Sequence, residues 1–141
     1  MLIMTKLTTK EKAFIEQVKP LLKKFLKLCK KEGIKPGAGT YVLSEKNNIY
    51  HGVPFEVARW IHGEENAIGT MVTEEGINSK FKIILIVGSP NDVIMPCGMC
   101  REAINRYGVG DAAVLCGNLF LTKIKKFTIS ELYPYPYQGE D

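Results

Sequence analysis

The chain has 141 residues, 45% of them hydrophobic and 24% charged, and a formal net charge of +4; these values are typical of one globular domain and exclude a disordered chain. The lysines gather in the first third without alternating aromatic residues, which favours the solvated face of a helix over a nucleic-acid surface. Residues 1–12 are polar and no apolar run is as long as a membrane span, so we expect no signal peptide, no membrane helix and a cytoplasmic location.

The first predicted element is an amphipathic helix over residues 8–32. Thr8 and Glu11 have the spacing of a capping box, and apolar residues recur at helical spacing after them. Pro20 should kink or break this helix, and Gly33 should end it.

Strands and helices alternate in the rest of the chain. Turn residues 45–48 predict a hairpin between the first two strands, and Gly117-Asn118 predicts a tight antiparallel hairpin between the last two. The run Ile83–Val87 is apolar throughout, which indicates a central strand buried on both faces. In chain order the elements are strands over 40–43 and 49–53, a helix over 62–75, a strand over 82–87, a helix after Pro96, and strands over 112–116 and 119–124. One mixed sheet covered by helices, an α/β fold, accounts for this order.

Two short motifs, each at the start of a predicted helix, carry the chemistry. His62-Gly63-Glu64 offers an imidazole, and Cys97-x-x-Cys100 offers two thiolates one helical turn apart. Together they supply three ligands for a tetrahedral Zn²⁺ and leave the fourth position for water, as in catalytic zinc sites. The free N–H groups at a helix N-terminus favour the thiolate form. Glu64 is two residues from a ligand and is expected to take up and deliver protons.

Other interpretations of these motifs exist. An isolated C-x-x-C pair can be a redox pair or half of a structural zinc site. A structural site requires a fourth ligand, for which Cys116 and His51 are the spare candidates. We expect Cys116 to lie in the core at the end of a strand, and His51 to be a surface or packed residue. The two motifs together therefore favour a catalytic zinc centre.

These motifs resemble those of the cytidine deaminase family, nearest its blasticidin-S deaminase branch, over Gly37 to Tyr137. His62-Gly63-Glu64 is similar to the first zinc motif of that family, in its histidine version. Pro96-Cys97-Gly98-Met99-Cys100-Arg101 is similar to the second. Glu131-Leu132-Tyr133-Pro134, followed by Tyr137, is similar to the C-terminal motif.

The resemblance implies a particular fold and domain plan. The fold is a single-domain, three-layer α/β arrangement with a five-stranded mixed sheet covered by helices, in which the last two strands are antiparallel. The expected plan over residues 1–141 is an N-terminal helix at 8–32, a catalytic core at about 37–132 and a C-terminal aromatic arm at 133–141.

The resemblance also implies an activity. The expected enzyme is a zinc-dependent hydrolytic deaminase of a cytidine-like aminopyrimidine nucleoside, or of an analogue such as blasticidin S, that releases ammonia. Zn²⁺ would be held by His62, Cys97 and Cys100, and protons would be moved by Glu64. The residues expected to contact substrate are Glu56, Gly63 and Tyr137, the last reaching toward the pocket of a neighbour in a homotetramer or dimer.

One segment departs from the family pattern. Where the nucleoside enzymes bind ribose through Gly-x-Asn-x-Glu, residues 52–56 read Gly-Val-Pro-Phe-Glu. Glu56 is retained, but Pro54 has no side-chain donor, so we expect weak activity on cytidine and little preference between cytidine and deoxycytidine. The alternatives are a deaminase of nucleic acid or a purine base, and a non-catalytic zinc-binding relative. The sequence assigns no role to Glu65 or Glu102.

Overall fold

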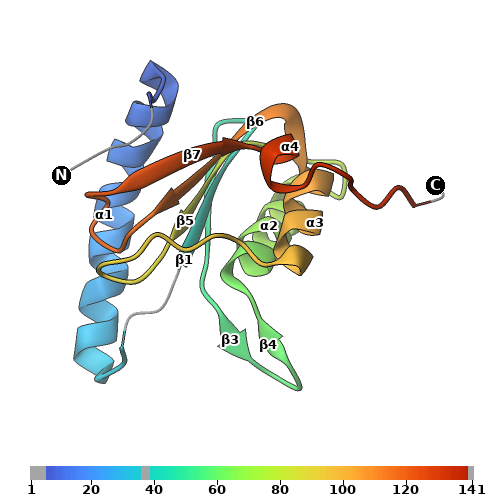
Figure 1. Cartoon of the computed structure of the whole chain (residues 1–141). Helices are drawn as coiled ribbons and strands as arrows, with labels where there is room; N and C mark the ends of the chain where they lie inside the picture. The colour runs from blue at the N-terminus through green and yellow to red at the C-terminus, as the bar shows by residue number, and fades with distance from the viewer. Residues whose placement is uncertain (1–5, 36–38, 140–141) are drawn as a thin grey trace.

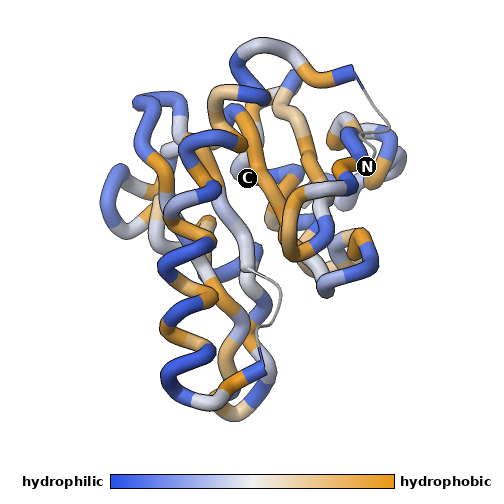
Figure 2. Tube along the Cα trace, turned by 90° about the vertical axis from the view of Figure 1, so that its left-hand side faces the viewer, coloured by the Kyte–Doolittle hydropathy of each residue, from blue (hydrophilic) through white to orange (hydrophobic). Residues whose placement is uncertain are grey.

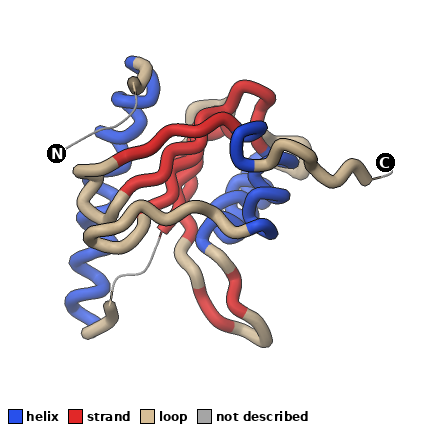
Figure 3. The backbone as a smooth tube through the Cα atoms, in the orientation of Figure 1, coloured by secondary structure: helices blue, strands red, loops and turns tan. Residues whose placement is uncertain are grey.

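One five-stranded sheet forms the middle of the molecule and carries helices on both faces (Figures 1 and 3). The computed structural model describes residues 6–35 and 39–139. Its elements are α1 (Thr9–Glu32), β1 (Gly39–Ser44), β2 (Ile49–Gly52), β3 (Phe55–Glu56), β4 (Trp60–Ile61), α2 (Gly63–Glu75), β5 (Phe81–Val87), α3 (Gly98–Tyr107), β6 (Gly108–Gly117), β7 (Ile124–Thr128) and α4 (Ile129–Leu132). Gly37, where the family resemblance begins, and the last two residues of the expected arm lie outside the described residues.

The sheet is mixed, as the sequence predicted. Its strand order is β2-β1-β5-β6-β7. β5 and β6 are parallel, and the other neighbouring pairs are antiparallel, including the final pair β6 and β7. β5 occupies the central position that its apolar run indicated. The α/β class and the antiparallel final strands are therefore confirmed.

Among the described helices, α1 is the one that covers the first face of the sheet. Its capping box is present: the Glu11 N–H donates to Thr8 Oγ1 at 3.1 Å, and the Thr8 N–H donates to Glu11 Oε1 at 3.0 Å. Gly33 ends the helix in the left-handed conformation, at φ 68°. The helix continues through Pro20 without a break, because Pro20 lies on the exposed side, where water can satisfy the carbonyl that loses its donor. Among the described residues, no helix is both long and apolar enough to cross a membrane.

Alternate residues of β5 enter two separate cores. Ile83, Leu85 and Val87 pack against the α1 side, where Figure 2 shows hydrophobic and hydrophilic residues alternating along the helix. Ile84 and Ile86 pack against α2 and α3 on the other side. Because successive side chains of a strand point to opposite faces, one continuous apolar run serves both layers. The expected three-layer arrangement is present.

The predicted strand over 119–124 and the predicted tight turn at Gly117-Asn118 are both wrong. Residues 118–123 form the connection between β6 and β7, and the last strand begins at Ile124. The buried Asn118 organises this connection: its Oδ1 accepts the N–H groups of Thr122 and Lys123, both at 2.9 Å. Leu121 has φ 56°, which no strand residue adopts. Leu119 and Leu121 are apolar because they pack into the core beside α1, so their hydrophobicity reflects burial in a loop.

Candidate active site

The N-termini of α2 and α3 meet at one edge of the sheet. α2 leads by a short connection into β5, and α3 leads directly into β6. A helix that enters a strand in this way runs opposite to it, so both helices begin near the carboxyl ends of the two parallel strands. That edge is where open α/β sheets usually bind ligands.

Gly52 permits a close approach between β2 and α2. A Cβ on Gly52 would lie 2.2 Å from the Ala67 nitrogen and 2.6 Å from the Gly63 oxygen. Both atoms are backbone and cannot move aside, so only glycine fits here. The end of β2 therefore packs directly on the first turns of α2, which fixes where His62 begins the helix.

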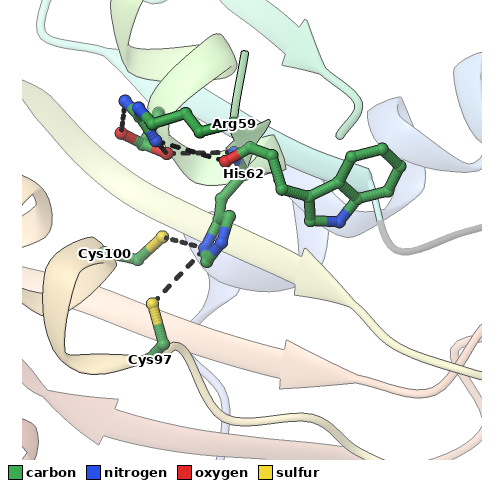
Figure 4. A network of polar contacts seen from close by, with 6 residues as sticks. Arg59, His62, Cys97 and Cys100 are labelled. Carbon is green, nitrogen blue, oxygen red and sulfur yellow. Dashed lines mark hydrogen bonds and ion pairs between the residues drawn. The ribbon is translucent and has the colours of Figure 1, made fainter. Parts of the chain in front are cut away.

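Three predicted ligands come together at this edge. His62 Nδ1 lies 3.2 Å from Cys100 Sγ and 3.3 Å from Cys97 Sγ, and the three ligand atoms are all within 4.8 Å of one another (Figure 4). Zinc–ligand bonds in a tetrahedral site place nitrogen and sulfur roughly 3.6 Å apart. The cluster is therefore close to the size that zinc requires, and Nδ1 is the nitrogen that faces the thiols.

The surroundings of the thiols also fit a cation. Cys97 is the N-cap of α3 and is exposed, whereas Cys100 is fully buried in the first turn. Burial raises the pKa of the Cys100 thiol, and the charges of Glu64 and Cys97 raise it further. A buried sulfur beside negative groups needs a positive partner to become a thiolate, and a bound Zn²⁺ supplies that charge.

Glu64 lies beside the cluster, in the first turn of α2, and is half-buried. Burial is the main cause of the raised pKa of the Cys100 thiol, and the charge of Glu64 and its hydrogen bond to that thiol raise it further. Burial is also the main cause of the raised pKa of Cys116, about 12, to which the charge of Glu64 adds. The Glu64 carboxylate therefore lies beside the Cys100 thiol, where it could exchange protons with a molecule bound at the proposed metal site.

The two spare ligand candidates lie outside the cluster. Cys116 is fully buried in β6, as the sequence predicted, and the three-residue metal group among the described residues does not include it. His51 lies in β2 and stacks on Tyr41, with ring centroids 4.1 Å apart. Tyr41 belongs to the core beside α1. His51 is thus a packed residue on the opposite face of the sheet from the ligands.

A group of contacts around His62 was not predicted from the sequence. Glu65 Oε1 accepts the His62 backbone N–H at 3.0 Å, and the Glu65 carboxylate also receives both terminal nitrogens of Arg59, at 3.3 and 3.0 Å (Figure 4). The hydrogen bond from Arg59 is the main reason that the pKa of Glu65 is lowered. The signal was available: His62-x-x-Glu65 has the spacing of an N-cap residue and its capping glutamate.

The β3–β4 hairpin was also not predicted, because its strands have two residues each. It connects β2 to α2 and projects from the body of the molecule (Figure 1). Phe55 pairs with Ile61, and Glu56 pairs with Trp60. Glu56, one of the expected substrate contacts, is therefore exposed on this hairpin, and Pro54 lies in the segment that leads into it.

The other two expected substrate contacts have different positions. Gly63 is buried in the first turn of α2, directly beside His62. Tyr137 is 65% exposed on the C-terminal arm, which extends from the body in Figure 1. Nearby, Gly139 lies close to Arg106 at the end of α3. Because Cys97 is at the opposite end of this helix, Tyr137 lies apart from the three metal-ligand residues of its own chain.

Arg101 holds the second zinc motif in place. Its Nε donates to the Pro96 carbonyl at 2.8 Å, and its Nη1 donates to the Leu132 carbonyl at 2.8 Å. One side chain thus ties the loop before Cys97 to α4. This role of Arg101 was not predicted from the motif, because Leu132 is 31 residues further along the chain.

Comparisons with known proteins point to a family with a zinc-binding region. The family profile for the cytidine and deoxycytidylate deaminase zinc-binding region matches residues 10–116. A cytidine deaminase from Sporosarcina psychrophila is 29% identical over 105 residues, which cover 73% of this chain and 76% of the relative.

Solved structures share the fold. The crystal structure of a cytidine deaminase from Burkholderia pseudomallei superposes with a TM-score of 0.64 at 21% identity, over 71% of this chain and 80% of that one. The structure of a cytidine deaminase from Mycobacterium leprae superposes with a TM-score of 0.57 at 20% identity, over 70% and 78%. The sheet order and the helical layers described above are therefore those of a known fold.

Proposed function

Because this chain belongs to the family of the cytidine and deoxycytidylate deaminase zinc-binding region, we propose that it is a hydrolytic deaminase of a cytidine-like aminopyrimidine nucleoside, or of an analogue such as blasticidin S. The observation that carries the proposal is the cluster of His62 Nδ1 and the sulfurs of Cys97 and Cys100 within 4.8 Å. A zinc-binding site beside a carboxylate has the two parts that hydrolytic deamination needs.

The proposed chemistry divides the work between metal and protein. Bound zinc lowers the pKa of water and so supplies a nucleophile near neutral pH. Glu64 accepts the proton that the attacking water loses and transfers it to the ring nitrogen of the substrate. It then assists the departure of ammonia. The backbone N–H groups of Gly63, Glu64 and Cys97, at the starts of two helices, donate to the charge that develops on the substrate.

The proposed substrate contacts are Glu56, Gly63 and Tyr137. Glu56 accepts a hydrogen bond from a substrate hydroxyl, and Gly63 lines the pocket beside the metal. Tyr137 reaches the pocket of a neighbouring subunit in a homotetramer or dimer, which the exposure of its side chain on the C-terminal arm supports. We further propose a cytoplasmic location, since a reducing compartment keeps thiolate ligands such as Cys97 and Cys100 reduced.

Substrate range tests the proposal. Ammonia release is measured with zinc-loaded protein on cytidine, deoxycytidine, cytosine, blasticidin S, and adenine and guanine compounds. We expect activity on an aminopyrimidine compound, with cytidine a weak substrate and little preference between cytidine and deoxycytidine, because Pro54 cannot donate to a sugar hydroxyl. Activity on the purines alone, or no activity on the panel, would contradict the proposal.

Pro54→Asn tests the reason for weak cytidine turnover. If the missing donor is the cause, kcat/KM for cytidine should rise in this variant while its zinc content stays the same. Efficient, ribose-selective turnover by the unmodified chain would show that a different residue holds the sugar.

Glu64→Gln tests the proton carrier. The variant should fold and retain zinc, and its turnover should fall by about 10²–10⁴-fold. The matched control is Glu74→Gln, which removes an exposed carboxylate at the other end of α2 and should leave turnover unchanged. A Glu64→Gln variant that keeps more than roughly a tenth of the activity would remove Glu64 from the mechanism.

A further inference from the structure

The β3–β4 hairpin has little apolar packing to hold it. The side chains of Phe55, Val57 and Trp60 are 44%, 58% and 53% exposed. Beyond their pairing with each other, the two strands make few contacts with the remaining elements. A two-residue antiparallel pair is not stable by itself in water. The orientation of the hairpin must therefore depend on a small number of polar contacts.

Arg59 makes the principal polar contact from the hairpin to the rest of the molecule. It closes the hairpin turn, where its carbonyl accepts the Val57 N–H at 2.9 Å. Both terminal nitrogens of its guanidinium donate to the Glu65 carboxylate, and Nη1 also donates to the Trp60 carbonyl at 3.2 Å. A forked arginine–carboxylate pair fixes direction as well as distance. The ion pair therefore links the turn of the hairpin to the first turn of α2 in a defined geometry.

Glu65 connects this ion pair to the metal site. The carboxylate that binds Arg59 also caps the backbone N–H of His62, at 3.0 Å. The Glu65 side chain is 20% exposed and the Arg59 side chain is 54% exposed. Glu65, on α2, is therefore the more firmly held member of the pair. One side chain thus contacts both the hairpin and the backbone of a metal ligand.

We propose that Arg59 and Glu65 are positioning residues, whose ion pair holds the β3–β4 hairpin at a defined place beside the zinc-binding end of α2. This inference rests on the proposed function in one respect: the hairpin carries Glu56, the proposed sugar contact, directly opposite Trp60. The ion pair then sets how far Glu56 stands from the metal cluster. It acts on substrate binding and leaves the proton transfers of Glu64 unchanged.

Trp60 provides a direct probe, because it is the single tryptophan of the chain and lies in the hairpin. The fast component of its time-resolved fluorescence anisotropy reports motion on the nanosecond scale. Arg59→Gln and Glu65→Gln should each increase the amplitude of this component. Glu65→Gln keeps an oxygen that can accept the His62 N–H but loses the charge that binds Arg59. Arg59→Lys, which keeps the charge without the fork, should give an intermediate amplitude.

The kinetic signature should appear in KM. Surface ion pairs contribute little, so we expect KM to rise about two- to fivefold and kcat to stay within about twofold in Arg59→Gln. Zinc content should be unchanged. Because the two residues act as a unit, the double variant Arg59→Gln/Glu65→Gln should resemble either single variant. High salt should increase the amplitude of the fast Trp60 anisotropy component in the unmodified chain and have little effect on it in the variants.

Lys19→Gln is the matched control. It breaks the Lys19–Glu16 ion pair, whose lysine is 50% exposed, on α1 at the opposite face of the sheet. It should change neither the Trp60 anisotropy nor KM. Should Arg59→Gln fail to fold, Arg59→Lys and the salt titration of the unmodified chain decide the question instead.

Three results would overturn the proposal. The first is an unchanged Trp60 anisotropy in both single variants and in high salt. The second is strict additivity of the two substitutions, and the third is zinc loss from Arg59→Gln, which would make the pair a support of the metal ligands. If the unmodified chain deaminates nothing on the panel, the proposed function fails, and the Trp60 measurements still decide whether the ion pair positions the hairpin.

Discussion

The four cysteines divide into two kinds by their surroundings. Cys97 and Cys100 lie around His62 Nδ1, whereas Cys29 is buried in α1 and Cys116 is buried in β6. A thiol that only packs can be replaced by a small apolar residue at modest cost, but a metal ligand cannot. The role of each cysteine can therefore be read from metal content and stability measured together.

Replacing either ligand cysteine should release zinc. The unmodified protein should carry about one zinc ion per chain, and Cys97→Ser or Cys100→Ser should lose both the metal and part of the free energy of unfolding. Zinc content by elemental analysis and thermal unfolding check this. The control, Cys29→Ala, should keep its zinc. Full zinc occupancy in both serine variants would contradict the ligand assignment.

His51 is enclosed by aromatic rings. It stacks on Tyr41 at an interplanar angle of 10° and meets the edge of Phe25, whose centroid is 5.4 Å away. Its Nε2 is buried and has no hydrogen-bond partner among the described residues. Burial lowers the pKa of His51, so the folded chain favours the neutral ring more strongly than the unfolded chain does.

This shift predicts acid sensitivity. Above the unfolded pKa of about 6.5, both states hold neutral His51 and the pH has no effect through this residue. As the pH falls below that value, the unfolded state binds the proton first, and the free energy of unfolding decreases until the folded pKa is passed. His51→Phe should flatten this dependence in urea titrations between about pH 7.5 and 5.5. An identical pH slope in both proteins would show that His51 titrates alike when folded and unfolded.

Among the elements, α3 and α4 are joined by one side chain. Arg101 bridges the carbonyls of Pro96 and Leu132, so it aligns the start of α3 with the short final helix. α4 has only four residues, and its own Thr128 capping box closes its first turn. So short a helix depends on tertiary contacts to hold its position.

Arg101→Lys should weaken this junction. Lysine keeps the charge but cannot donate in two directions from a rigid plane, so at least one of the two carbonyls loses its donor. We expect a loss of about 1 kcal/mol in the free energy of unfolding, the low end of the cost of an unsatisfied partner because both hydrogen bonds are only partly buried, and weaker zinc retention in a chelator competition. Stability and zinc retention equal to those of the unmodified chain would show that water replaces the guanidinium at no cost.

At the scale of the whole molecule, the aromatic side chains of the C-terminal arm have little cover. Tyr135 is 93% exposed and Tyr137 is 65% exposed, although the Tyr137 N–H donates to Tyr133 Oη at 3.2 Å. Exposed aromatic residues on an extended arm are effective interface anchors. This supports the proposed homo-oligomer, in which the arm packs on a neighbouring chain.

The oligomer can be tested by light scattering at micromolar concentration. The unmodified protein should have the mass of a homotetramer or a dimer, and Tyr135→Ser/Tyr137→Ser should shift it toward the monomer by removing buried apolar area. Phe120→Ser is the control, since Phe120 is 62% exposed in the connection between β6 and β7. A monomeric unmodified protein would contradict both the oligomer and the shared pocket.

Features that depend on near neighbours in the chain were readable from the sequence. The capping box of α1, the left-handed Gly33 and the two-sided burial of β5 each follow from spacings of a few residues. The spacing of Cys97 and Cys100 belongs to the same class, because a helix brings residues three apart to one side. The local backbone conformation alone determines how the residues of such a pattern are arranged, so the rest of the fold is not needed to predict them.

The tertiary structure decided what depends on residues far apart in the chain. His62 meets Cys100 across 38 positions because two helices begin at the same edge of the sheet. The apolar run after Gly117 resembles a strand, but Asn118 hydrogen bonds and packing beside α1 make it a loop. The β3–β4 hairpin is too short to show a period, and its orientation follows from the charge of Arg59 meeting Glu65 in space. Hydrophobicity reports burial alone, and only the packed chain determines which backbone geometry provides that burial.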